Sequence, residues 1–290
     1  MFTSVKIIEC PRDAMQGFVQ FIPTEVKIAY LNQLLRVGFD TLDCGSFVSP
    51  KAVPQMRDTA EVLSGLDLAG TATRLLAIVA NLRGAEEALL HPNVSYLGFP
   101  LSISETFQQR NTNRSIEEAL QLVETLQNLC VKHGRTLVVY LSMGFGNPYG
   151  DVYHPELIGN FLTRLAALDI RIVSLADTTG MADAALIRQV VEAVIPAFPQ
   201  LEIGVHLHTT PAAVEEKIAA AYEAGCRRFD GALGGYGGCP MAREELTGNV
   251  PTERLLRWLK AAAVKLPIQE EALSGALQMI PEVFRGGETR

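Results

Sequence analysis

The sequence predicts a (β/α)8 barrel, also called a TIM barrel, followed by a C-terminal helical extension. Eight short apolar runs, rich in Val, Ile, Leu and Tyr, alternate with longer amphipathic stretches along the chain. Runs of about 4–7 such residues are typical of parallel strands buried on both faces. Eight strand–helix units fit in about 265 residues without a long linker, which favours a single catalytic domain over residues 1–290. The predicted strands are residues 5–9, 41–43, 74–79, 94–98, 136–142, 171–176, 202–206 and 228–231.

Candidate helices lie between these strands. The clearest signal is at Ser115, where Glu118 follows three residues later and forms a capping-box pattern. Thr24 is an expected N-cap, and Pro155 and Pro211 suit the first turn of a helix. The same alternation is compatible with an open doubly wound sheet, which is the alternative architecture. The expected helices are residues 24–37, 115–132, 155–168, 183–197, 211–224 and 252–264, with 268–280 as the extension.

Composition and charge exclude several classes of protein. The 290 residues are 48% hydrophobic and 20% charged, which is the balance of a folded globular chain. A net charge of −7 argues against a nucleic-acid or anionic-membrane surface. The five cysteines are widely spaced without a CxxC pair, so neither a disulfide framework nor a structural zinc site is expected. With no signal peptide or membrane-spanning run in the sequence, we expect a cytoplasmic protein.

Polar residues follow three of the predicted strands, at the end where TIM barrels place their functional groups. Arg12 and Asp13 follow the first strand as a charged pair, which on its own fits a structural ion pair as well as a ligand site. His206 and His208 are two residues apart on an extended segment, so both point to the same side and suit metal ligation. A glycine-rich loop after the eighth strand carries Cys239.

The strand-exit residues form a mixed oxygen and nitrogen donor set. Asp13, His206, His208 and Asn249 suit an octahedral divalent ion such as Mg²⁺ or Mn²⁺ better than tetrahedral zinc. Arg12 beside such an ion would stabilise a developing oxyanion, and Cys239 would donate or accept a proton. The set therefore indicates chemistry that passes through an enolate or an alkoxide.

Several motifs together resemble 3-hydroxy-3-methylglutaryl-CoA lyase, a family within the metal-dependent TIM-barrel lyases and Claisen-type condensing enzymes. The resemblance runs from about residue 5 to about residue 260, and its lyase-specific block is residues 46–56. The other matching segments are Arg12-Asp13 with Gln16, residues 22–28, His206 with His208, residues 237–240 and Gly248-Asn249.

The resemblance implies cleavage of 3-hydroxy-3-methylglutaryl-CoA to acetyl-CoA and acetoacetate, a reaction of leucine degradation and ketone-body formation. It implies that Asp13, His206, His208 and Asn249 hold the metal. Arg12 matches the enolate-stabilising arginine, and Cys239 matches the proton-transfer cysteine. Arg12 and Gln16 are predicted to contact the acyl-CoA substrate, and a homodimer is expected.

Some positions depart from the family pattern. Cys10 and Ala14 replace glycines, residues 17–19 differ, and Thr209 stands where aspartate is common. Asp43 replaces an active-site glutamate at the end of the second strand and is one methylene shorter. The shorter side chain gives two possibilities, a conservative change that tunes the rate or space for a larger acyl branch.

Two further hypotheses about the function stay open. A condensing enzyme that joins acetyl-CoA to a 2-oxo acid would share the metal site, but such relatives usually carry a sizeable further segment after the barrel, whereas this sequence ends soon after the predicted barrel and its one extra helix. A non-catalytic barrel that binds acyl-CoA would explain the changes after the first two strands. It would not explain Cys239, because binding alone needs no proton shuttle.

Overall fold

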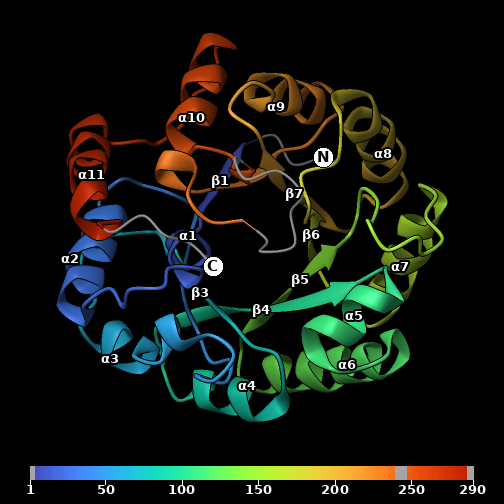
Figure 1. The fold of residues 1–290 in the computed structure, drawn as a ribbon, viewed down its shortest axis with the longest axis horizontal. Coiled ribbons are helices and arrows are strands. Elements are labelled where there is room, and N and C mark those ends of the chain that lie inside the picture. The colour runs from blue at the N-terminus through green and yellow to red at the C-terminus, as the bar shows by residue number, and fades with distance from the viewer. Residues whose placement is uncertain (1–3, 239–246, 286–290) are drawn as a thin grey trace.

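The computed structural model describes residues 4–238 and 247–285 and shows a closed barrel of eight parallel strands surrounded by helices (Figure 1). The strand order is β6-β5-β4-β3-β2-β1-β8-β7, and pairing of β6 with β7 closes the sheet. Closure confirms the TIM barrel and excludes the doubly wound alternative, whose sheet has two free edges. The strands are β1 Lys6–Glu9, β2 Thr41–Ser46, β3 Arg74–Ile78, β4 Val94–Ser102, β5 Thr136–Ser142, β6 Ile172–Asp177, β7 Glu202–Thr209 and β8 Arg228–Gly231.

The six predicted helices and the helical extension are present, with three local corrections, one of which is that Pro155 is the N-cap of its helix rather than a first-turn residue. Ser115 and Glu118 form the expected capping box at the start of one helix. Thr24 is the first residue of its helix rather than its N-cap, because its hydroxyl donates to Asp58 instead of capping the backbone. Pro211 lies outside its helix, which begins at Val214. These elements are α2 Thr24–Leu35, α6 Ile116–Lys132, α7 Glu156–Ala167, α8 Ala184–Ala197, α9 Val214–Glu223, α10 Thr252–Ala261 and α11 Glu270–Val283.

Several short elements lack a clear sequence signal. None is longer than eight residues, whereas an amphipathic helix is recognised over a window of about 11–18 residues, so the hydrophobic pattern of each is ambiguous. One of them, β9 (Gly248–Asn249), adds an antiparallel strand beside β7 and places Asn249 opposite His208. The others are α1 Pro11–Gln16, α3 Thr59–Ser64, α4 Leu82–Leu89, α5 Glu105–Thr112 and the 3-10 turns η1 Pro54–Met56 and η2 Leu233–Gly235. Among the described residues, no helix combines the length and apolarity that a membrane crossing requires.

The strands are buried on both faces. The main core lies between the barrel and its helices, and a smaller apolar cluster lies apart from it, with Leu76, Val138, Tyr140 and Ile172 among its members. At the amino ends of the strands, Glu202 accepts hydrogen bonds from Lys6 (2.6 Å) and Arg228 (3.1 Å). These charged groups lie at the amino end of the barrel, and the predicted site lies at the opposite end, where the strands have their carboxyl ends.

The C-terminal extension supports the segment that follows β8. Helix α11 packs against α2, where Gln33 donates a hydrogen bond of 2.8 Å to the carbonyl of Ala272 (Figure 1). Phe284, at the end of α11, stacks on Tyr236 with ring centroids 4.3 Å apart. Tyr236 lies between Gly235 and Gly237 in the glycine-rich loop, so the extension anchors the first part of that loop.

Glu9 also connects β1 to this region from inside the protein. Its carboxyl group accepts hydrogen bonds from the backbone N–H of Leu233 (2.8 Å) and the hydroxyl of Thr252 (2.6 Å). Complete burial raises the pKa of Glu9 from 4.5 to about 8, although both hydrogen bonds oppose the change. Glu9 is therefore protonated in the folded protein at neutral pH.

A consequence is a pH-dependent stability that Glu9→Gln should remove. Because the folded-state pKa is raised, the stabilisation from Glu9 is complete below about pH 4.5 and is lost as pH rises towards about 8. The loss amounts to as much as about 4 kcal/mol in the free energy of unfolding. Thermal melts across this range should show a decline for wild type that is reduced in Glu9→Gln. Glu86→Gln, at an exposed position on α4, should follow wild type. Parallel curves for Glu9→Gln and wild type would contradict the assignment.

Candidate metal and substrate site

The predicted site residues in the described part of the chain converge at the carboxyl ends of the strands. Arg12, Asp13 and Gln16 lie on α1, which begins directly after β1 because Pro11 occupies its first turn. His206 and His208 lie on β7 and point to the same side, as the two-residue spacing predicts, with ring centroids 5.2 Å apart. Cys239 lies outside the described residues.

Three of these side chains could hold a metal ion. One ligand atom from each of Asp13, His206 and His208 lies within 4.8 Å of the others, and all three residues are buried. We call these residues the outer group. Nδ1 of His208 is 2.9 Å from the carbonyl oxygen of Thr178, so it carries the proton and leaves a lone pair on Nε2. Nε2 is buried and has no hydrogen-bond partner among residues 4–238 and 247–285. An unpartnered imidazole nitrogen beside a carboxylate fits a divalent cation.

The charges of the outer group also suit a cation. Burial raises the pKa of Asp13, but Arg12 and the two histidines outweigh it and lower that pKa to about 2. Burial, together with the neighbouring His206, lowers the pKa of His208 to about 4. At neutral pH Asp13 thus offers an ionised carboxylate and His208 a neutral imidazole, the forms that bind metals.

Asn249 is close to this group, but its amide nitrogen, and not its oxygen, faces Asp13. Nδ2 donates to Oδ2 of Asp13 (2.7 Å) and to the carbonyl of Tyr236 (2.8 Å). Ligation through the amide oxygen would require this amide to rotate by about 180°. Which of the two amide orientations Asn249 adopts depends on the hydrogen-bond partners that surround it. Gly237 packs against the same residues, and a Cβ there would lie 2.7 Å from the Asp13 carbonyl oxygen. Glycine is therefore required where the loop passes the outer group.

Arg12 is held by two carboxylates. Nε lies 3.0 Å from Oδ2 of Asp43, Nη2 also donates to Asp43, and Nη1 donates to Asp13 at 3.0 Å. Burial disfavours the charged guanidinium, but Asp43 and Asp13 outweigh it and raise the Arg12 pKa above its ordinary value. Burial raises the pKa of Asp43 to about 6, against the opposing effect of Arg12. Arg12 is thus a fixed cation beside the outer group.

Asp43 reaches Arg12 directly, as its expected position near the barrel mouth suggests. The pairing of β2 with β3 shifts register between Asp43 and Gly45. Asp43 lies in the interior of β2, which continues to Ser46, so the expectation that it ends the strand is wrong; its carboxylate contacts Arg12 from within the sheet. Gln16 completes the arrangement, because its Oε1 accepts from Arg12 (3.0 Å) and its Nε2 donates to Asp13 (2.8 Å).

A cavity of about 330 Å³ opens over these groups. Arg12, Asp13, Gln16, His206 and His208 line it together with an apolar wall. The apolar residues include Val48, Ala52, Val53, Ile78, Ala80, Pro100 and Phe107. This combination of convergent polar groups and an apolar wall is typical of a small-molecule site.

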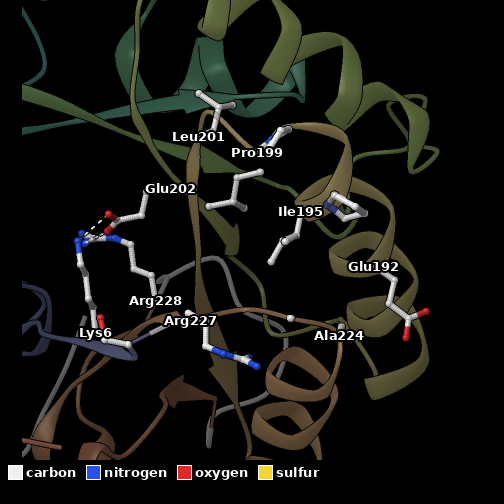
Figure 2. A pocket seen from close by; sticks show the side chains of 13 residues that line it. Lys6, Glu192, Ile195, Pro199, Leu201, Glu202, Ala224, Arg227 and Arg228 are labelled. Carbon is white, nitrogen blue, oxygen red and sulfur yellow. Dashed lines mark hydrogen bonds and ion pairs between the residues drawn. The ribbon is translucent and has the colours of Figure 1, made fainter. Parts of the chain in front are cut away.

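A second cavity, of about 400 Å³, lies at the other end of the barrel (Figure 2). Its wall includes Ile195, Pro199 and Leu201, and its charged residues include Lys6 and Arg228, which pair with Glu202. It contains none of the predicted site residues, so the cavity over the outer group is the candidate active site.

Sequence reasoning missed the residues beneath His206. Asp230, in the interior of β8, lies 3.3 Å from Nδ1 of His206 through Oδ2, which also accepts a hydrogen bond from Ser174 (3.1 Å). The ring of Tyr140 meets that of His206 edge-on at 5.9 Å. Asp230 falls inside a short apolar run, so its charge was the only available signal.

The closed barrel and the buried outer group define a class of protein, a TIM barrel with a candidate metal site at its catalytic end. The HMGL-like family model matches residues 5–280. A hydroxymethylglutaryl-CoA lyase of Bacillus subtilis is 35% identical over 272 residues, covering 94% of this chain and 90% of its own. The chain belongs to the HMGL-like family.

Other relatives agree in fold and length. A 3-hydroxy-3-isohexenylglutaryl-CoA/hydroxymethylglutaryl-CoA lyase of Pseudomonas aeruginosa is 34% identical, with 97% of this chain and 93% of that protein covered. The crystal structure of a Bacillus subtilis HMG-CoA lyase superposes with a TM-score of 0.90 at 34% identity, covering 96% and 93% of the two chains. An Acinetobacter baumannii HMG-CoA lyase solved with coenzyme A and 3-methylmalate gives a TM-score of 0.89 at 30% identity, covering 99% and 92%.

Proposed function

We propose that this protein cleaves 3-hydroxy-3-methylglutaryl-CoA to acetyl-CoA and acetoacetate. The observation that carries the proposal is the outer group beside a fixed Arg12 in a chain of the HMGL-like family. Related lyases with the same fold, one of them solved with coenzyme A, support an acyl-CoA substrate.

Asp13, His206 and His208 would hold a divalent metal, with Asn249 joining through its oxygen after rotation of the amide. The oxygen and nitrogen donors favour Mg²⁺ or Mn²⁺. Such an ion acidifies a substrate hydroxyl and polarises an adjacent carbonyl. Nδ1 of His208 remains fixed by the carbonyl of Thr178, which orients the ring.

Arg12 is assigned to the enolate that forms when the carbon–carbon bond breaks. The 3-hydroxyl loses its proton to solvent, its oxygen forms the ketone of acetoacetate as the bond between C2 and C3 cleaves, and the electron pair of that bond forms the enolate of acetyl-CoA. A guanidinium already oriented by Asp43, Asp13 and Gln16 stabilises this charge without reorganising. Cys239 is the candidate donor of the proton that converts the enolate to acetyl-CoA.

A direct assay tests this function. Purified protein with Mg²⁺ and 3-hydroxy-3-methylglutaryl-CoA should release acetoacetate and acetyl-CoA in equal amounts, and a chelator should stop the reaction. Consumption of acetyl-CoA in the presence of 2-oxo acids, without cleavage, would instead indicate a condensing enzyme. Binding of acyl-CoA with neither reaction would indicate the non-catalytic alternative.

A second candidate substrate carries a larger branch at C3. The cavity has an apolar wall that includes Val53, Ile78 and Phe107, and Asp43 is one methylene shorter than glutamate. The Pseudomonas aeruginosa relative carries both substrates in its name, 3-hydroxy-3-isohexenylglutaryl-CoA with a long branch and hydroxymethylglutaryl-CoA with a short one. A 3-hydroxyglutaryl-CoA with a longer apolar branch is therefore the alternative to test.

Asp43→Glu distinguishes the two substrates. Glutamate is longer by about 1.5 Å, and position 43 is fully buried against Arg12, so the variant moves the guanidinium towards the cavity. If the larger branch is the natural one, kcat/KM should fall about tenfold or more for that substrate and rise for hydroxymethylglutaryl-CoA. Equal effects on the two substrates would show that Asp43 tunes the rate and does not select the branch.

The proposed activity comes with an expected location, oligomeric state and metabolic role. We place the protein in the cytoplasm as a homodimer, with its reaction in leucine degradation and ketone-body formation. Cytoplasmic relatives exist, such as that of Rattus norvegicus, which is 33% identical over 256 residues. Light scattering of the purified chain tests the homodimer.

A further inference from the structure

A second set of potential metal ligands lies beneath the outer group. Cys10, His206 and Asp230 are all buried, and one ligand atom from each lies within 4.8 Å of the others. We call these residues the inner group. Cys10 follows β1 directly, His206 is on β7, and Asp230 is on β8, at a position paired with His206. The two groups share His206 alone.

We propose that the inner group is a binding site for a thiophilic divalent metal such as Zn²⁺, and that a metal there excludes a metal from the outer group. Thiolate, imidazole and carboxylate together are a donor set that zinc prefers, whereas Mg²⁺ avoids sulfur. The inference concerns metal selection and does not depend on the proposed lyase activity.

The spacing of the inner group supports this assignment. Two ligands held at about 2.0–2.1 Å around a tetrahedral centre lie roughly 3.3 Å apart. Nδ1 of His206 and Oδ2 of Asp230 are separated by 3.3 Å. The thiol of Cys10 donates weakly to the Ile8 carbonyl at 3.7 Å, so little holds it away from a metal.

The inner group has one unused polar atom of its own, and a neighbouring residue has another. Oδ1 of Asp230 is buried without a hydrogen-bond partner in the described part of the chain, and the same holds for the hydroxyl of Tyr140. Buried polar atoms without partners are rare in folded proteins and indicate room for an ordered water or an ion. The Tyr140 ring meets the His206 ring edge-on, which places a polar residue beside the inner group. Tyr140 and His206 both line the cavity over the outer group, so an ion can enter from there.

The tautomer of His206 explains why the two sites exclude each other. When Nδ1–H donates to Asp230, the lone pair lies on Nε2 and is available to the outer group. A metal in the inner group needs the lone pair of Nδ1, so the ring proton moves to Nε2. His206 then offers the outer group a hydrogen in place of a lone pair. The Cys10 thiol loses its proton to solvent when the metal binds.

Cadmium is the probe for the inner group, because a sulfur–cadmium bond absorbs in the ultraviolet. Cd²⁺ titrated into the metal-free full chain should produce this absorption for wild type and for Cys239→Ala, the matched control. Cys10→Ala and Cys10→Ser should lose it while melting cooperatively. Two variants are used so that misfolding of one does not leave the question open. Absorption that persists without the Cys10 thiol, or that is absent from wild type, would overturn the proposal.

Competition with Mg²⁺ tests the exclusion. At Mg²⁺ about ten times its own dissociation constant, the apparent dissociation constant for Cd²⁺ in wild type should rise about tenfold. Asp13→Asn weakens the outer group without touching the inner one, so Mg²⁺ should then have little effect on the cadmium absorption. If Mg²⁺ leaves cadmium binding unchanged in wild type, the sites are independent and the shared-histidine mechanism is wrong. These measurements follow binding alone, so they succeed or fail separately from the lyase assay.

Discussion

His208→Ala is expected to lower kcat/KM by more than about a hundredfold and to weaken Mn²⁺ binding at least as much. Changes to groups that merely orient a metal ligand cost about 10–100-fold, and His208 is itself a candidate ligand. The variant removes the unpartnered Nε2 and leaves Asp13 beside one imidazole in place of two. Electron paramagnetic resonance of Mn²⁺ measures the affinity on the free protein, and steady-state cleavage of hydroxymethylglutaryl-CoA measures the rate.

The matched control is His133→Ala, at an exposed histidine after α6. It should change neither Mn²⁺ binding nor cleavage. A His208→Ala protein that folds and binds Mn²⁺ with unchanged affinity would show that the outer group is not the metal site. Loss of cleavage with intact metal binding would instead give His208 a role towards the substrate.

Arg12→Lys is expected to lower kcat by about 10²–10³, the cost of removing one donor from an oxyanion site. The guanidinium uses Nε and Nη2 for Asp43 and Nη1 for Asp13 and Gln16. A lysine ammonium is a compact charge on a flexible stem and cannot match this fork. The charge stays in the site, so binding of the anionic substrate should change little and KM should rise less than about threefold.

Separate values of kcat and KM test this role, since an effect confined to KM would make Arg12 a binding residue only. Arg36→Lys, at an exposed arginine following α2, provides the control and should be indistinguishable from wild type. Because Asp43 is fully buried, a thermal melt of Arg12→Lys should confirm that the variant is folded before its kinetics are interpreted.

Local patterns in the sequence were sufficient for the fold class and for part of the site. The alternation of apolar runs and amphipathic stretches predicted eight strands, because a strand buried on both faces needs a continuous apolar run. The spacing of His206 and His208 predicted a shared direction, since side chains two apart on a strand point to one side. The capping box at Ser115 was readable because both of its partners lie within one helical turn.

Tertiary structure decided which distant residues meet. Asn249 reaches Asp13 only because β9 pairs with β7, a two-residue pairing with no hydrophobic period. Asp43 meets Arg12 only because α1 packs against β2, and Asp230 lies under His206 only because β7 and β8 are neighbours in the closed sheet. Periodicity reports which face of an element is buried, whereas these contacts depend on the register between strands. Register is set when the barrel closes, so the orientation of Arg12 and the environment of His206 follow from the folded chain and from no local segment of it.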